Sequence, residues 1–377
     1  MNAKKISILL MGLSLNFQVI AEVKPPNYQL LRQNENWSVL KNMSPSERAA
    51  DPWNKIKYIP LDKGYLSFGG SMRDRVESWK NYLSSTSNND TFNLWQMFLY
   101  GDFQMNDNFR TFIELKSALS SNRNLPGGIR ELDEDQFALQ QAFVDLKIFP
   151  TPGSSLTLRP GRQLLSFGNQ RLISPLPWAN TYRAWDGVSI LFKHDNWKSQ
   201  TFFTQFVPVR RVTFNQPSAA NKLNGTYVTH SGTTHNQDFY YLHTQRDTQG
   251  FLNGTGGTTL AKDKRHTVGS RLFGDFSNHL VDYEAEGAFQ FGKWGNKNIR
   301  AYMVALFASH TYTNVMLKPK IYGGYDYASG GSPTASTQQT FLQLFPLGHA
   351  YLGWIDYVGR QNVSSPHIPN TFQNAWF

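Results

Sequence analysis

The chain alternates between apolar and polar residues with a period of two in a segment that begins just after Gly64. Successive side chains of a β-strand point to opposite faces, so this alternation predicts a strand with one apolar and one polar face. The apolar face carries Leu66, Phe68, Met72 and Val76, and the polar face carries Ser67, Gly69, Ser71, Arg73, Arg75 and Glu77. Charged residues therefore lie within the predicted strand.

Four further segments repeat this alternation, at residues 93–105, 109–119, 140–149 and 280–291. Short turns such as Asn106–Asn108 alternate with longer polar stretches, of which residues 217–263 are read as one loop. Short turns, long loops and a charged second face are typical of an outer-membrane β-barrel. We therefore expect an all-β fold, a transmembrane antiparallel β-barrel, with a soluble β-sandwich as the alternative.

Composition agrees with this prediction. The apolar share of 40% excludes a disordered chain, and the aromatic share of 14% suits the aromatic girdles of a barrel, in which Trp95, Trp294 and Trp354 are predicted interface anchors. Beyond the N-terminus, no apolar run reaches the roughly 18 residues of a spanning helix, which excludes a helical membrane protein. The absence of cysteine excludes a disulfide framework and thiolate metal sites.

The N-terminus has the pattern of a secretory signal peptide. Lys4 and Lys5 precede an apolar stretch, and Ala21 is a plausible cleavage point, so residues 1–21 are predicted to be the signal. Residues 22–60 show no strand alternation and are predicted to form a periplasmic N-terminal segment with a short helix or two. Residues 61–377 are predicted to form the barrel, in the outer membrane of a Gram-negative bacterium.

The net charge is +10, and without Lys4 and Lys5 it is 10 − 2 = +8. For an exported protein, this charge favours anionic lipids, glycans or solutes as partners over nucleic acid. Arg73, Arg75 and Glu77 are predicted to line the lumen, with a solvated loop edge as the alternative. Arg271 and Arg360 are further lumen candidates.

The stretch RQLLSFGNQRLISPLPW, from Arg162 to Trp178, is too broken for a helix and too charged for a core strand. Its prolines are predicted to end a strand and to fold the following segment inward. Leu158 and Arg162 share parity, so an irregularity at Pro160–Gly161 is expected unless Arg162 packs elsewhere. The alternative role for Arg162, Arg171 and Arg183 is an ion-pair network with Asp186, Asp145 or Glu114 that only fixes a loop.

Three motifs carry a family resemblance: LRPGRQLLSFGNQRLISPLPWANTYRAWDGV, YDYASG and QLFPLGHAYLGWIDYVGRQN, at residues 158–188, 325–330 and 343–362. They resemble the alginate export family of outer-membrane porins. The resemblance implies a single-chain barrel of about eighteen strands with an arginine-rich lumen for an anionic uronate polymer. It places Arg162, Arg171, Arg183 and Asp186 in the family motif. The family continues beyond GRQN with further strands, whereas here Pro366 and Pro369 interrupt a short tail, so fewer strands are expected.

These observations predict an outer-membrane channel for an anionic polysaccharide such as alginate, in which arginines attract carboxylates and interleaved acids prevent trapping. Tyr182 and Trp185 are candidates for stacking on sugars. A general or small-anion porin is the nearest alternative, and a plugged structural barrel is another. A hydrolase is the enzymatic rival, but its candidate residues His230, His235, Asp238 and His243 fit no metal or nucleophile motif. We expect no enzymatic activity, no cofactor and no metal, and we expect outer-membrane lipid and periplasmic export proteins as partners.

Overall fold

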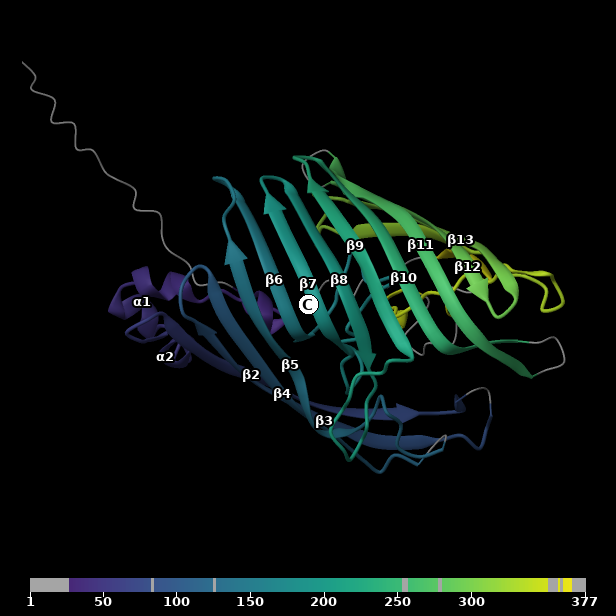
Figure 1. Ribbon diagram of the computed structural model, residues 1–377, viewed down its shortest axis with the longest axis horizontal. Helices are drawn as coiled ribbons and strands as arrows, with labels where there is room; N and C mark the ends of the chain where they lie inside the picture. Colours follow the sequence, from purple (N-terminus) through teal and green to yellow (C-terminus); the bar gives the residue numbers. More distant parts are fainter. Residues whose placement is uncertain are drawn as a thin grey trace, which may run out of the picture.

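The computed structural model describes residues 27–82, 85–124, 127–252, 257–276, 280–351, 359 and 362–367. One antiparallel sheet dominates these residues (Figure 1). Its strands are β1 (Ile59–Pro60), β2 (Tyr65–Trp79), β3 (Asp90–Gln104), β4 (Phe109–Ser121), β5 (Asp135–Ile148), β6 (Ser154–Gln163), β7 (Ala184–His194), β8 (Trp197–Val207), β9 (Asn221–Ser231), β10 (His235–Leu252), β11 (Thr258–Phe276), β12 (Val281–Trp294), β13 (Lys297–Thr311), β14 (Lys320–Ala328), β15 (Thr337–Gln338) and β16 (Val363–His367). The short helices are η1 (Arg32–Asn34), η2 (Ser38–Asn42), α1 (Pro45–Ala49), α2 (Asn54–Lys57) and η4 (Gly348–Ala350).

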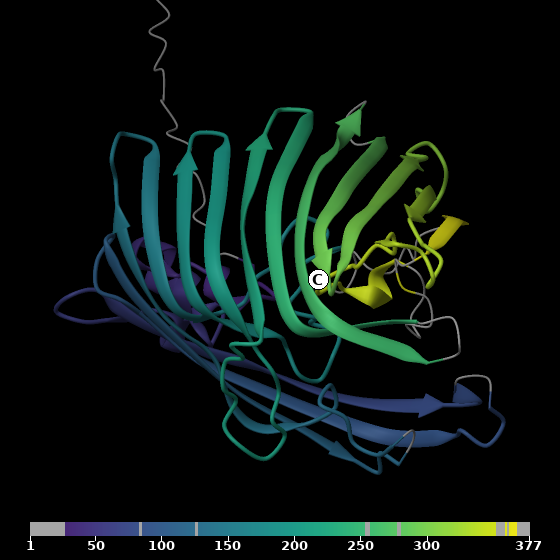
Figure 2. The ribbon, with the colours of Figure 1, turned by 45° about the vertical axis from the view of Figure 1, so that its right-hand side comes forward.

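Each strand pairs with the next along the chain, from β1 to β14 and then β16, while β15 pairs in parallel with β13. The sheet curls, so that β2–β4 lie beneath the wall formed by β5–β13 (Figure 2). This continuous antiparallel meander confirms the predicted fold class. The described residues contribute 16 strands, fewer than the family number of about eighteen.

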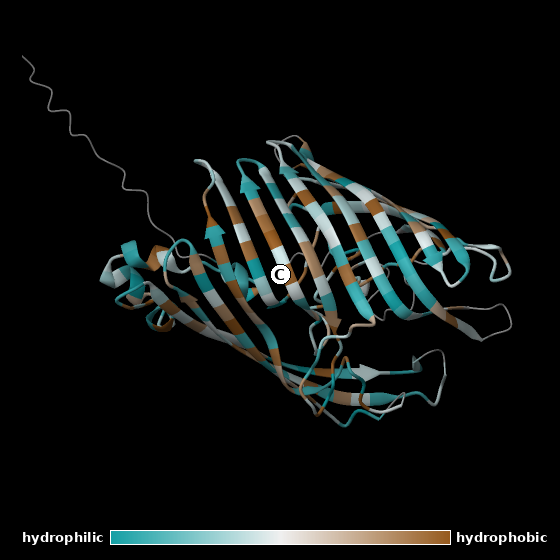
Figure 3. Ribbon diagram, viewed as in Figure 1, coloured by the Kyte–Doolittle hydropathy of each residue, from teal (hydrophilic) through white to brown (hydrophobic). Residues whose placement is uncertain are grey.

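The burial pattern of the sheet is inverted relative to a soluble domain. Met72 and Val76 on β2 are each 71% exposed, whereas Glu114 and Lys116 on β4 are buried. Apolar side chains thus cover the outer face and charged side chains the inner face, as the alternation predicts for β2–β5 and β12. Figure 3 shows the resulting apolar bands along neighbouring strands.

The turns at one end of the sheet are short, including Asn106–Asn108 and the turn at Asp195, and the connections at the other end are mostly longer. The prediction of one polar loop across residues 217–263 is wrong, because β9, β10 and the start of β11 occupy most of it. These strands are rich in Thr, Asn, Gln and His, which weakens the period-two signal. Thr is β-branched and suits a strand, and alternate residues such as Leu223, Tyr227 and Leu242 bury an inner face.

Two connections at the long-loop end fold back over the inner face of the sheet. We call residues 164–183 the first inward segment and residues 329–351 the second inward segment. They meet where Ile173 bridges Phe345, with Phe345 N donating to Leu172 O over 2.9 Å. Leu165, Ile173 and Phe345 join a buried core with inner-face residues of the strands, and each buried aliphatic side chain contributes about 1.5–3 kcal/mol. The predicted inward fold of the first segment is therefore present.

Residues 27–60 form the short helices and dock on β2–β5. Ser44 caps α1 in a reciprocal capping box with Glu47. Glu35 accepts hydrogen bonds from Trp37 Nε1 and Tyr100 Oη, at 3.1 and 2.8 Å, and Lys57 Nζ donates to Tyr100 Oη over 3.0 Å. Burial lowers the pKa of Lys57 despite the opposing charge of Glu35. The predicted short helices are thus confirmed.

The interface role predicted for Trp294 is wrong. Trp294 points inward, is only 6% exposed, packs edge-on against Phe251 and donates to Gln249 O over 2.8 Å. Trp294 shares the strand parity of the buried Glu284, Glu286 and Gln290, which places its side chain on the inner side of β12. Trp354, Arg360 and the predicted signal peptide lie outside the described residues. Within the described ranges, no helix is long and apolar enough to cross a membrane.

Candidate functional site

The candidate site is the inner face of the sheet where the first inward segment leaves β6. Arg159 points inward to Asp145, whereas Arg162 shares the strand parity of the exposed Leu158, and its partner Asp186 shares that of the exposed Val188. Gly161, between Arg159 and Arg162, has φ +128°, and a Cβ there would lie 2.2 Å from Ala142 O. The register of β6 with β5 and β7 does not shift at Pro160–Gly161, so the structure has no bulge there and Arg162 packs elsewhere, against Leu139 O and Asn215 O.

Arg162 and Asp186 are direct cross-strand partners on β6 and β7. The guanidinium donates from Nε and Nη2 to the two carboxylate oxygens, at 2.6 and 2.8 Å. It also donates to Leu139 O and Asn215 O. Arg162 is buried and its donors are used, so in this conformation it fixes the start of the first inward segment.

Arg171 and Arg271 share one network with acids of β10 and β12. Arg171 from the first inward segment pairs with Glu284, and its Nη1 lies 2.9 Å from Glu286 Oε2. Arg271 on β11 pairs with Asp238 and Glu284, at 2.9 and 3.0 Å. The two predicted arginines thus meet through Glu284, and the network ties the first inward segment to the wall.

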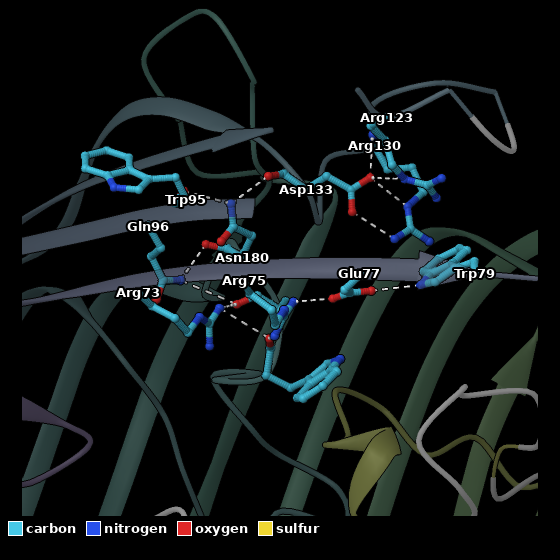
Figure 4. A network of polar contacts seen from close by, with 12 residues as sticks. Arg73, Arg75, Glu77, Trp79, Trp95, Gln96, Arg123, Arg130, Asp133 and Asn180 are labelled. Carbon is cyan, nitrogen blue, oxygen red and sulfur yellow. Dashed lines mark hydrogen bonds and ion pairs between the residues drawn. The ribbon is translucent and has the colours of Figure 1, made fainter. Parts of the chain in front are cut away.

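Arg73 and Arg75 on β2 hold the other end of the first inward segment, as Figure 4 shows. Arg73 donates to Pro177 O over 3.1 Å and to Ala179 O over 2.8 Å, and Arg75 donates to Trp178 O over 2.8 Å. Arg75 also pairs with Glu77 at 2.8 Å and lies over the ring of Trp178. Within the described residues, no carboxylate oxygen lies within 4.0 Å of the Arg73 guanidinium.

Asn180 fastens the same stretch. Its buried side-chain amide donates to Trp95 O, Leu119 O and Asp133 O, over 3.1, 3.1 and 2.9 Å, and its backbone oxygen accepts from Gln96 over 2.6 Å. Figure 4 shows Asp133 close by.

Arg123 and Arg130 surround the Asp133 carboxylate. Burial alone would raise the pKa of Asp133, but hydrogen bonds from the Arg130 side chain and backbone and the charges of both arginines hold it below its usual range. The carboxylate therefore stays ionised and fixes the loop between β4 and β5.

Arg183 ends the first inward segment and donates to Pro346 O over 2.8 Å, which joins the two inward segments. Arg246 on β10 attaches the second inward segment to the wall. It donates to Leu344 O over 2.9 Å and lies over the ring of Phe345. Sequence reasoning missed Arg246 because the stretch around it was read as a loop. The backbone carbonyl that Arg246 contacts neutralises no charge.

The two predicted stacking residues are buried. Tyr182 packs against Phe98, and burial raises its pKa to about 12. Trp185 is fully buried between Phe206 and Phe345, and its Nε1 has no hydrogen-bond partner in the structure. In this conformation neither ring is open to a sugar.

A ladder of ion pairs on β3–β6 was also missed. Arg110 pairs with Asp102 at 2.8 Å and with Asp145 at 3.8 Å, and Asp145 pairs with Arg159 at 2.6 Å. Lys116 and Asp135 form a further buried pair at 2.8 Å. The signal was present in the polar-face positions of these strands, but the pairing depends on registers that no single strand specifies. Acids and cations alternate around this wall, so its local charge is nearly balanced.

A cavity of about 110 Å³ lies between the N-terminal segment, the wall and the first inward segment. Its lining includes Arg32, Glu114 and Tyr182. The cavity can hold a few water molecules.

The residues of the enzymatic rival are not brought together. Asp238 points inward to Arg271 and accepts from Tyr227, whereas His235 contacts Tyr283 and His230 packs against Trp197. Within the part of the chain that the structure describes, no group of three or more His, Cys, Asp or Glu residues could hold a metal ion.

Comparison with known proteins gives one family and several distant structures. The family model described as "Alginate export" matches residues 64–375. OmpT of Vibrio cholerae is 12% identical, with a TM-score of 0.42, over 71% of this chain and 78% of that one. OmpF of Salmonella typhi, in complex with daunomycin, is 11% identical, with a TM-score of 0.36, over 81% and 96%. No curated protein matches the sequence significantly.

Proposed function

Because the chain belongs to the alginate export family of outer-membrane channels, we propose that it passes an anionic polysaccharide such as alginate along the inner face of its sheet. The proposed conduit uses the arginines of this face, above all Arg73 and Arg75 on β2. Export partners in the periplasm would meet the short-turn end, where β1 follows the N-terminal segment.

The observation that carries the proposal is the environment of Arg73. Its Nη1 and Nη2 donate to carbonyl oxygens of residues 177 and 179, whereas its buried Nε has no hydrogen-bond partner among the described residues, and its charge is retained. Glu77 compensates one of the two arginines, which leaves Arg73, Arg75 and Glu77 with a net charge of +1 (2 − 1). A uronate carboxylate offers the same hydrogen bonds together with an opposite charge, and a bidentate carboxylate is the stronger partner.

A change of hydrogen-bond partner at Arg73 would couple passage of the anion to movement of the first inward segment. A carboxylate that takes the guanidinium releases the backbone of residues 177–179, and the first inward segment then loses part of its attachment to β2. The ladder around Arg110 and Asp145 is already paired, so it presents only moderate attraction to a moving anion. Several moderate sites favour conduction over trapping.

A small-anion porin is the second candidate, and the two inward segments that cross the inner face favour it. The two inward segments meet in the middle of the sheet, where Leu172 and Phe345 are buried. A polymer requires both segments to move, whereas a small anion requires less displacement. The same arginines would serve either solute.

Reversal potential across a planar bilayer tests the proposal, with refolded mature protein under a salt gradient. We expect anion selectivity and block of the current by an oligouronate, with a neutral oligosaccharide of equal length as the control. Arg73→Gln should weaken both properties, and Arg73→Lys should retain selectivity. Arg171 is a poorer probe, because its replacement leaves Glu284 and Glu286 unpaired and disturbs the segment itself.

The outcomes separate the candidates. Current that is anion-selective but unaffected by the oligouronate would favour the small-anion porin. Cation selectivity, or an Arg73→Gln variant identical to wild type, would refute the role of Arg73. A folded protein without any current would indicate a plugged barrel.

A further inference from the structure

A row of polar and basic residues crosses the outer face of β9–β13. Successive direct partners in this row are Lys222 with Gln245, Gln245 with Lys264, Lys264 with Lys293, and Lys293 with Asn298. The row points outward, because Lys264 shares the strand face of the exposed Val268, and Lys293 that of the exposed Phe291. Arg300 lies on the same face, opposite Phe291. We call Lys222, Lys264, Lys293 and Arg300 the outer basic row.

The outer basic row has no acidic partners. Within the described residues, no carboxylate lies within 4.0 Å of any of its four cations, and the nearby Asp247 pairs with Lys262 instead. Lys264 and Lys293 stand directly opposite each other, an arrangement that is unfavourable without a compensating charge. An external anion that bridges the two ammonium groups would remove this repulsion.

The position of the row indicates where that anion comes from. From the row toward the short-turn end, the outer face becomes apolar and aromatic, with Tyr241, Val268, Phe289 and Tyr302 exposed. On β11 this band runs from His266 to Phe276, close to the roughly ten residues that a tilted strand needs to cross a membrane. Figure 3 shows β9–β11 becoming hydrophilic toward the lower ends of the strands.

The row lies toward the long-loop end, near the β10–β11 connection. Long loops are extracellular in outer-membrane barrels. The row therefore lies at the headgroup level of the outer leaflet.

We propose that the outer basic row binds the phosphate groups of lipopolysaccharide, the phosphorylated glycolipid of the outer leaflet. Clustered lysines and arginines at a membrane surface recognise anionic headgroups, and Arg300 adds bidentate donors. The band around Phe289 and Tyr302 offers packing for the acyl chains beneath the phosphates. The inference rests on outer-membrane placement and is independent of what the lumen passes.

Titration of the lipid-stripped, folded mature protein with fluorescent lipid A tests the proposal. We expect the Lys264→Gln/Lys293→Gln variant to bind about 30-fold more weakly than wild type, as for two cations at an anionic headgroup. The matched control is Lys193→Gln/Lys198→Gln, which removes another directly opposed lysine pair, at the short-turn end. This control should bind lipid A like wild type. Heat-modifiable migration confirms that each variant is folded.

Three results would overturn the proposal: unchanged affinity in the test variant, an equal loss in the control variant, or equal binding of lipid A and its dephosphorylated form. Displacement of lipid A by inorganic phosphate at equal concentration would indicate a free-anion site and would also overturn the lipid assignment. If the double variant does not fold, Lys264→Gln and Arg300→Gln should each lose about fivefold in affinity. Bilayer conductance is measured separately, so failure here leaves the proposed channel function untouched.

Discussion

Arg162 and Asp186 face each other across β6 and β7 as direct partners, joined by two hydrogen bonds of 2.6 and 2.8 Å. The pair sits where the chain leaves β6 for the first inward segment and where it returns to β7. One ion pair therefore closes both ends of the 20-residue excursion from 164 to 183.

Loss of this pair should destabilise the protein measurably. Asp186→Asn leaves the buried Arg162 charge without its carboxylate, and we expect a loss of about 2 kcal/mol in the free energy of unfolding, since Asp186 is partly exposed. Urea unfolding in lipid vesicles measures it. Lys262→Gln, which breaks the exposed Lys262–Asp247 pair, should cost about 0.5 kcal/mol or less. Equal effects of both variants would contradict the structural role of Arg162.

Replacement of the Asn180 amide by a carboxylate should destabilise the first inward segment. Asn180→Leu removes an amide that donates to three backbone carbonyls, and we expect a loss of about 1–3 kcal/mol. Asn180→Asp keeps the shape but turns an acceptor toward those oxygens, so it should be worse than Leu at neutral pH. The rate of proteolysis within the first inward segment reports the loosening. An Asp variant as resistant as wild type would show that the three contacts do not hold the segment.

Much of the wall could be predicted from sequence, because period-two alternation is a local property. The faces of β2, and the inward course of the chain after the Pro160–Gly161 pair, follow from residues near one another in sequence. Strands β9, β10 and the start of β11 could not be predicted, because Thr, Asn and Gln on both faces hide their period. The inward position of Trp294 follows from the same parity as Glu286 and Gln290, whereas aromatic composition alone suggested the wrong face.

The partners of the arginines could not be predicted from the sequence, for a different reason. Arg171 meets Glu284 and Glu286 across more than 100 positions, and Arg73 meets a backbone carbonyl 104 positions away. Such contacts depend on strand register and on the course of an inward loop, neither of which a local pattern contains. The alternation along the strands predicts which charged residues lie on the inner face. Only the structure shows which of these charges are neutralised by an ion-pair partner.

The loop anchored by Asp133 should resist mild acid. Since the folded-state pKa of Asp133 lies below its ordinary value, its contribution is complete above that value and is lost only as pH falls through the lower, folded-state pKa. We expect proteolysis of residues 127–134 to stay constant from pH 7 to about pH 4 and to rise below it. The Asp133→Asn variant should be cleaved faster at neutral pH, and its rate of cleavage should not show the rise in acid that is expected for the wild type. An acid limb that begins near pH 6 would contradict the assignment.

Gly161 should be irreplaceable where Gly323 is not. At Gly161 an alanine would have to adopt φ +128° and would place its Cβ 2.2 Å from Ala142 O, so β5 and β6 would have to separate. Backbone strain alone costs about 1–3 kcal/mol, and the clash adds to it, so Gly161→Ala should fold poorly or unfold at clearly lower urea concentration. At Gly323 on β14, a Cβ meets nothing within 4 Å, and Gly323→Ala should change the free energy of unfolding by about 0.5 kcal/mol at most. Urea titrations of both variants in the same vesicles decide the matter: equal stability would mean that a glycine at position 161 is not needed for the pairing of β5 and β6.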